Sequence, residues 1–267
     1  MSSLVDWMAE RPAFVLFLGL AVVMLVISLL FTKLSEWAFS GDTRSRTSTS
    51  VTTLVGVVAG LYAVLIAFVI VNEWQTFDQA SAYVSDEAAA LASAYFDASA
   101  LPEPARSDLH AALIAYDRSV VCDEIPHLAH HESPNRATRR ALVAVFDTAA
   151  RAAPAAASSP FYAPLIDELS KVAAARRYRV DSAASTLPDV LLVVILLTSV
   201  VLVALMSVLD TQHRRWHAVL ITAVTLLVAL NLALVFALDR PYDGAAKVSD
   251  TPLREGIPSA LLRCAPK

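Results

Sequence analysis

Four stretches of the 267-residue chain consist of uncharged, mainly apolar residues: 12–32, about 53–71, 190–209 and 218–238. A helix needs roughly 20 such residues to cross the hydrocarbon core of a bilayer, which is about 30 Å thick. The chain is therefore expected to be an integral membrane protein with four transmembrane helices. The first stretch follows Asp6, Glu10 and Arg11 rather than a basic segment, so we expect an uncleaved span and not a signal peptide.

The composition agrees with a membrane protein and argues against other classes. Hydrophobic residues make up 57% of the chain and charged residues 17%, whereas soluble domains have about 25% charged residues. A net charge of -4 gives no basic footprint for nucleic acid. No phosphate-binding, dinucleotide, serine-hydrolase or zinc-protease motif is present, so we expect neither an enzyme nor a cofactor.

The long segment between the second and third spans has helical periodicity. Trp74, Val84, Ala88 and Leu91 follow the three-four spacing of a helix packed along one seam, so the second span is expected to continue as a rod of more than 40 residues. Three further helices are expected, starting near Arg106, Ser133 and Ser159, with a loop at 123–132.

The predicted fold class is all-α, with a helical extramembrane domain inserted between spans 2 and 3. The expected divisions are 1–72 for the first two spans and their polar loop, 73–189 for the helical domain, 190–238 for the last two spans and 239–267 for the tail.

The orientation rests on the charge of the loops. The short loops 33–51 and 210–217 carry a net charge of about +2, which favours the cytoplasmic side for them and an extracytoplasmic domain. Three arginines just before the third span, Arg176, Arg177 and Arg179, favour the reverse arrangement.

Both cysteines fall on the domain side of the predicted spans. Outside the cytoplasm, Cys122 and Cys264 could form a disulfide that holds the tail on the domain. The alternative is two unrelated thiols.

Small residues line one face of the second span, at Gly56, Gly60, Ala63 and Ala67. Such a stripe lets another helix approach closely, either within one chain or between copies of the chain. These four residues are candidates for helix packing or for a pore.

Polar residues gather where the spans are expected to meet the domain. They are Asn72, Glu73, Arg176, Arg179, Asp189, Asp239, Arg240 and Asp243. Ionisable groups at this depth pair with one another or line a polar path, although a solvated belt of side chains is the simpler interpretation.

A histidine group, His127, His130 and His131, lies beside Cys122 and acidic residues. Imidazole and carboxylate groups can bind a transition metal, but the spacing matches no established site. An exposed loop is the favoured interpretation.

Several segments together resemble a bacterial membrane family labelled bestrophin-like. The first block of that family is similar to Gly60–Phe68, Trp74, Ala80, Glu87-Ala88, Leu91 and Tyr95, followed by Leu101-Pro102, Arg106 and Tyr116. A later block is similar to Arg176, Arg179 and Leu187-Pro188, and the closing motif to Leu238–Gly244. A tryptophan motif expected near 122–126 is replaced here by Cys122–Pro126.

The resemblance implies a location in the bacterial cytoplasmic membrane, in contact with lipid, and an oligomeric anion channel as the expected function, since bestrophins are pentameric anion channels. It also implies a cytoplasmic domain, contrary to the loop charges. The alternatives are a non-conducting accessory subunit or sensor that binds a membrane-complex partner through the helical domain, and an enzyme or metal-handling protein built on the histidines.

Overall fold

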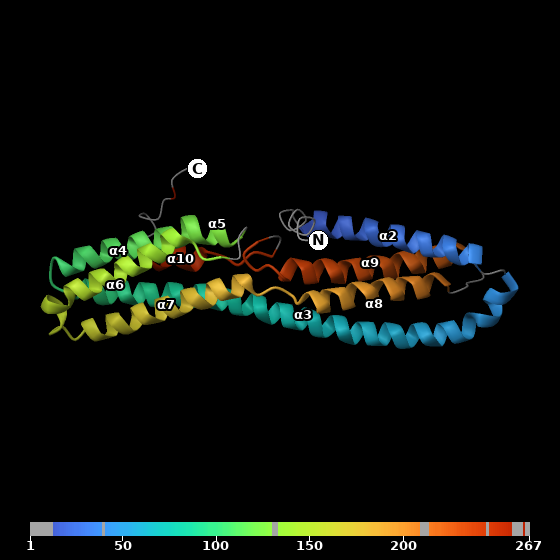
Figure 1. Cartoon of the computed structure of the whole chain (residues 1–267), viewed down its shortest axis with the longest axis horizontal. Coiled ribbons are helices and arrows are strands. Elements are labelled where there is room, and N and C mark those ends of the chain that lie inside the picture. Colours follow the sequence, from blue (N-terminus) through green and yellow to red (C-terminus); the bar gives the residue numbers. More distant parts are fainter. Residues whose placement is uncertain are drawn as a thin grey trace. The chain divides into compact units, whose positions relative to one another are not determined.

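The computed structural model describes residues 13–38, 41–129, 133–208, 214–243, 246–257 and 264. Within these ranges the regular secondary structure is helical throughout, which confirms the all-α prediction (Figure 1). The chain forms two compact units. The first includes residues up to Gln75 and Leu187–Asp239, and the second includes Thr76–Thr186, Arg240–Asp243 and residues from Lys247 onward.

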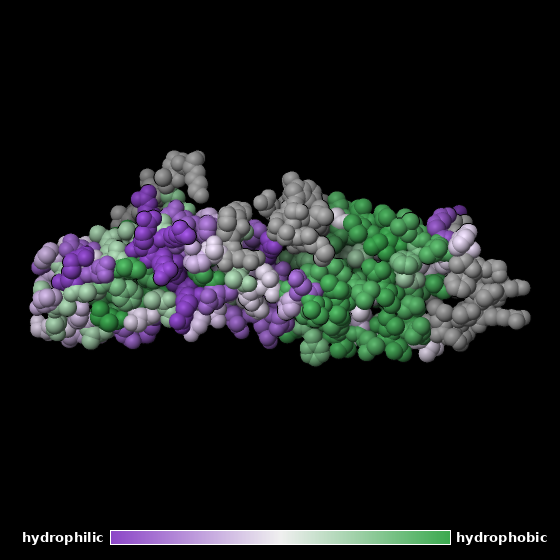
Figure 2. Space-filling model, viewed as in Figure 1, coloured by the Kyte–Doolittle hydropathy of each residue, from purple (hydrophilic) through white to green (hydrophobic). Residues whose placement is uncertain are grey.

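The first unit is a bundle of long apolar helices. It contains α2 (Ala13–Ala38), the first part of α3 (Gly41–Ser99), α8 (Asp189–Val208) and α9 (Arg214–Leu238), and α2 packs against both α8 and α9. Each of these four helices is long and apolar enough to cross a membrane. Most of their large side chains are exposed, which gives the unit the apolar surface seen in Figure 2. Lipid is the natural solvent for such a surface.

Polar contacts fix the helices of this unit to one another. The hydroxyl of Tyr62 on α3 accepts a hydrogen bond from Ser199 of α8 at 3.3 Å, and both side chains are buried. Asp239, directly after α9, accepts the backbone N–H of Leu187 at 2.6 Å, which ties the end of α9 to the residues before α8. Hydrogen bonds of this kind are valuable between apolar helices because few other groups can satisfy the donors.

The second unit is a helical domain with its own apolar core. Its elements are the second part of α3, α4 (Ala105–Ser119), a π-helical turn η1 (Val120–Glu124), α5 (Ile125–Leu128), α6 (Arg136–Ala156), α7 (Tyr162–Ala184) and α10 (Thr251–Gly256). Helices α4 and α6 pack closely, and one apolar core unites α3, α4, α6, α7 and the residues around α10. The buried positions of each helix follow the three-four spacing. In α4 they include Leu109, Leu113 and Tyr116.

Several local expectations need correction. Residues 123–128 were expected to be a loop, but η1 and α5 continue the helix to Leu128. The cap of α6 is Asn135 rather than Ser133: its side chain accepts the backbone N–H of Ala137 at 2.8 Å, the arrangement an N-cap requires. Helix α10 was not anticipated, because its six residues are too few for a periodic pattern.

Candidate functional site

A buried ionic cluster lies at the centre of the second unit. It consists of Glu87 of α3, Tyr116 of α4, Glu124 of η1, and Arg176 and Arg179 of α7. Four of the five side chains are fully buried, and Arg176 is 8% exposed. Residues separated by 92 positions in the sequence are thus joined inside the domain core.

Arg179 is the hub of this cluster. Its Nε donates to Glu87 Oε2 at 2.6 Å, and its Nη2 donates to Glu124 Oε2 at 2.8 Å. Arg176 binds the same Glu124 in bidentate fashion, through Nε at 3.0 Å and through Nη2. The Tyr116 hydroxyl donates to Glu87 Oε1 at 2.6 Å. Two guanidinium groups therefore balance two carboxylates, with good geometry for charge-assisted bonds.

Glu124 enters the cluster from the π-helical turn η1. A π turn holds one more residue than an α turn, and such turns are frequent at functional sites. Val120, Val121 and Glu124 are all buried along η1. Glu124 lies four residues after the buried Val120, on the inner face that contacts Arg176 and Arg179 of α7.

Burial sets the protonation behaviour of the cluster. Burial disfavours the charge of Arg179, but the carboxylates of Glu87 and Glu124 outweigh it, so the pKa of Arg179 lies above its ordinary value. Burial, followed by the charge of Glu87, raises the pKa of Tyr116 well above the ordinary value, so this hydroxyl stays a donor.

The predicted belt of boundary residues divides between the two units. Asn72, Glu73, Asp189 and Asp239 belong to the first unit, where Asn72 donates to Glu73 at 3.3 Å. Arg240 and Asp243 belong to the second, with Arg176 and Arg179. The two arginines are enclosed and paired within the chain, so they are not the solvated anion-attracting groups that a boundary position implies.

The small-residue stripe of α3 faces away from the core of its own bundle. Gly56, Gly60, Ala63 and Ala67 are all exposed, whereas Val55, Tyr62, Ile66 and Val69 on the opposite side are buried. A Cβ atom added at Gly56 or Gly60 would meet no heavy atom within 4 Å. Packing within one chain therefore does not account for the two glycines.

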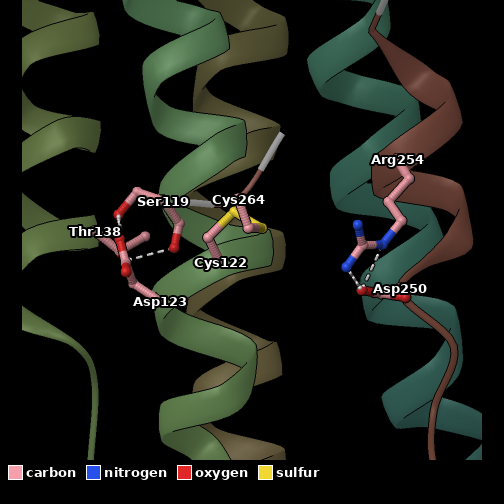
Figure 3. The surroundings of a disulfide bond; sticks show 7 residues. All are labelled: Ser119, Cys122, Asp123, Thr138, Asp250, Arg254 and Cys264. Atoms are coloured by element: carbon pink, nitrogen blue, oxygen red, sulfur yellow. Dashed lines mark hydrogen bonds and ion pairs between the residues drawn. A yellow bond between two sulfur atoms is a disulfide. The ribbon is translucent and has the colours of Figure 1, made fainter. Parts of the chain in front are cut away.

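The structure joins Cys122 to Cys264 through a disulfide, with the Cα atoms 5.5 Å apart (Figure 3). This bond attaches residue 264 to η1. Among the histidines, His127 lies in α5, whereas His130 and His131 lie outside the described residues. The part of the chain that the structure describes contains no group of three or more potential metal ligands.

The structure combines long apolar helices with a helical domain that contains buried ion pairs. This combination is typical of a helical membrane protein. Its family is shown by the sequence: the chain belongs to the Bestrophin-like family, whose domain matches residues 18–253. No functionally curated protein matches the chain.

The fold is also that of solved structures. Two crystal structures of a bacterial bestrophin homologue from Klebsiella pneumoniae, each carrying a mutation, are similar to this chain at 12% sequence identity. The TM-scores are 0.71 and 0.70. The matches cover 90% and 88% of this chain, and 97% and 98% of the homologue. At this identity the likeness concerns the fold.

Proposed function

We propose that the chain is the subunit of an oligomeric ion channel, with anions as the permeating ions and α3 at the interface between copies around the pore. The observation that carries this proposal is the outward small-residue face of α3. Gly56 and Gly60 leave space that none of the described residues fills, and small residues on such a face allow neighbouring helices to approach closely.

The chemistry of this face is compatible with conduction. Residues 52–71 contain no charged side chain, so no fixed charge binds or repels a passing ion, and constrictions of apolar residues can gate by dewetting. Membership of the Bestrophin-like family supports the same class of function. The proposal that the ions are anions rests on the family likeness alone. Arg176 and Arg179 do not support it, because both are already paired with carboxylates.

The alternative is a non-conducting accessory subunit or sensor that binds a partner through the helical domain. Its support is α3 itself, which runs 59 residues from Gly41 to Ser99 and contributes to both units. A single helix of this kind is suited to carry a conformational change from a domain to a membrane bundle.

Counting subunits separates the two proposals. We expect native mass spectrometry of the protein in nanodiscs to show a closed ring of several copies, five by the resemblance. A ring places the small-residue face of each α3 against a neighbour. A monomer or a simple dimer would leave no common axis for a pore and would favour the accessory role.

We further propose that the domain is extracytoplasmic in the bacterial cytoplasmic membrane. The Cys122–Cys264 pairing supports this orientation, because disulfides persist mainly in oxidising compartments. We expect protein from cells treated with a permeant alkylating agent before lysis to migrate faster on gels without reductant than with it. Cys264→Ser should abolish this difference. Two alkylated thiols in the wild-type protein would indicate a cytoplasmic domain.

A further inference from the structure

The chain after the last span forms a segment that packs on the second unit, which we call the C-terminal strap (residues 246–257). Val248, Leu253 and Ile257 of the strap are buried in the domain core. At Gly256 an added Cβ would lie 3.3 Å from the backbone oxygen of Ala88, so α10 approaches α3 closely. Tight apolar contact of this kind excludes water from the residues below it.

Asp117 of α4 is a buried carboxyl that the ionic cluster does not use. Its side chain is fully buried, and neither oxygen has a hydrogen-bond partner among the described residues. Buried carboxylates without partners are costly, because the charge loses its hydration and gains nothing in return. A proton removes that cost.

The charges around Asp117 favour the protonated form. Glu87 of α3 repels the ionised carboxylate, and Arg254 of α10 attracts it. Arg254 is largely engaged elsewhere, since its guanidinium pairs with Asp250 of the strap at 2.7 Å (Figure 3). Helix α7 directs Arg176 and Arg179 at the cluster carboxylates.

Helix α6 contributes none of the charges that shift the pKa of Asp117. The buried residues of α6, the helix that packs most closely on α4, are all uncharged. Burial first, and Glu87 second, raise the pKa of Asp117 to about 7. This carboxyl therefore changes its charge in the physiological range.

We propose that Asp117 is a proton-binding site that latches the C-terminal strap, which stays closed while the carboxyl is protonated and opens when the carboxyl ionises. The ionised group needs water, and in the closed domain no water reaches it. Opening of the strap hydrates the carboxylate and separates α10 from α3. This inference concerns the second unit alone and does not depend on conduction.

The sign and size of the effect follow from linkage. An opened strap gives Asp117 the ordinary carboxyl pKa of about 3.9, so protonation favours the closed state and rising pH favours the open state. The opening equilibrium increases tenfold per pH unit up to the closed-state pKa of about 7 and then levels off. Between pH 5.5 and 8.5 it should rise about 30-fold, because 1.5 pH units lie below the plateau.

Hydrogen exchange of the full-length protein in nanodiscs measures this opening. After correction for the intrinsic pH dependence of exchange, peptides covering 246–257 should exchange about 30-fold faster at pH 8.5 than at pH 5.5. Peptides from α6 serve as the internal reference and should show no such step. Asp117→Asn, which cannot ionise, should remove the step from the strap.

Arg254→Gln provides a second test at an exposed position. Loss of this cation should raise the pKa of Asp117 and move the midpoint of strap opening to higher pH, whereas a merely structural role would change only the overall exchange rate. An unchanged midpoint in Arg254→Gln would overturn the proposal, as would a full pH step in Asp117→Asn. If Asp117→Asn does not fold, the Arg254→Gln midpoint decides alone.

Discussion

Replacement of Gly60 by tryptophan is expected to reduce chloride efflux from proteoliposomes about tenfold or more, while the subunit itself still folds. A side chain at this position enters the space outside the bundle, because an added Cβ meets no atom of the same chain within 4 Å. In the proposed ring, that space holds the neighbouring α3 or the pore. An indole there would separate the subunits or close the conduction path.

Leu61→Trp is the matched control for this variant. Leu61 is 68% exposed and adjacent in sequence, but the helical rotation of about 100° per residue places it away from the stripe. Efflux through Leu61→Trp should stay close to wild type. If both variants and the wild type showed equal efflux, the glycine face would lie neither in the pore nor at the contact between subunits, and the assignment would be contradicted.

Arg179→Met is expected to destabilise the helical domain by about 3–5 kcal/mol, the range found when one partner of a buried ion pair is removed. Methionine fills much of the volume but leaves Glu87 with no cation and Glu124 with one. The burial of an uncompensated carboxylate carries the cost. Thermal unfolding in nanodiscs, followed by near-ultraviolet circular dichroism, measures it.

Two further variants show whether charge balance causes this loss. In Glu87→Gln/Arg179→Met one anion and one cation are removed together, and the Glu124–Arg176 pair remains, so the double variant should be more stable than Arg179→Met. Lys171→Met breaks only exposed pairs with Asp167 and Glu168 and should change little. A double variant that unfolds as readily as Arg179→Met would refute the charge-balance explanation.

The helices of the fold could be predicted because their patterns are local. Uncharged stretches marked α2, α8 and α9 to within a few residues, and the three-four spacing showed that the second span continues as α3. Short elements escaped prediction. A periodic pattern can be recognised only over several helical turns. Helix α10 has six residues, which is too short for this.

The ionic cluster was not predicted, although the sequence of α7 contains a sign of it. Arg176 and Arg179 continue the spacing of Leu165, Leu169 and Val172, so they occupy core positions of α7. A charged residue on an apolar seam was the available signal. The partner of these arginines could not be identified from spacing, because spacing along one helix does not show which side chain of another helix it meets.

The neighbour of the small-residue stripe could not be predicted from the sequence. Spacing shows that Gly56, Gly60, Ala63 and Ala67 share one side of a helix, and it does not show which neighbour that side meets. The buried positions of the same helix, such as Tyr62 and Ile66, had to be located in three dimensions before the stripe could be seen to face outward.

Conduction by the purified protein tests the central claim most directly. The measurement is the reversal potential in a planar lipid bilayer that separates two chloride concentrations, with no other protein present. Currents that reverse near the chloride equilibrium potential, and that Gly60→Trp suppresses, are the predicted result. A bilayer that conducts no more than lipid alone, with protein confirmed in the membrane, would contradict the channel and leave the accessory subunit.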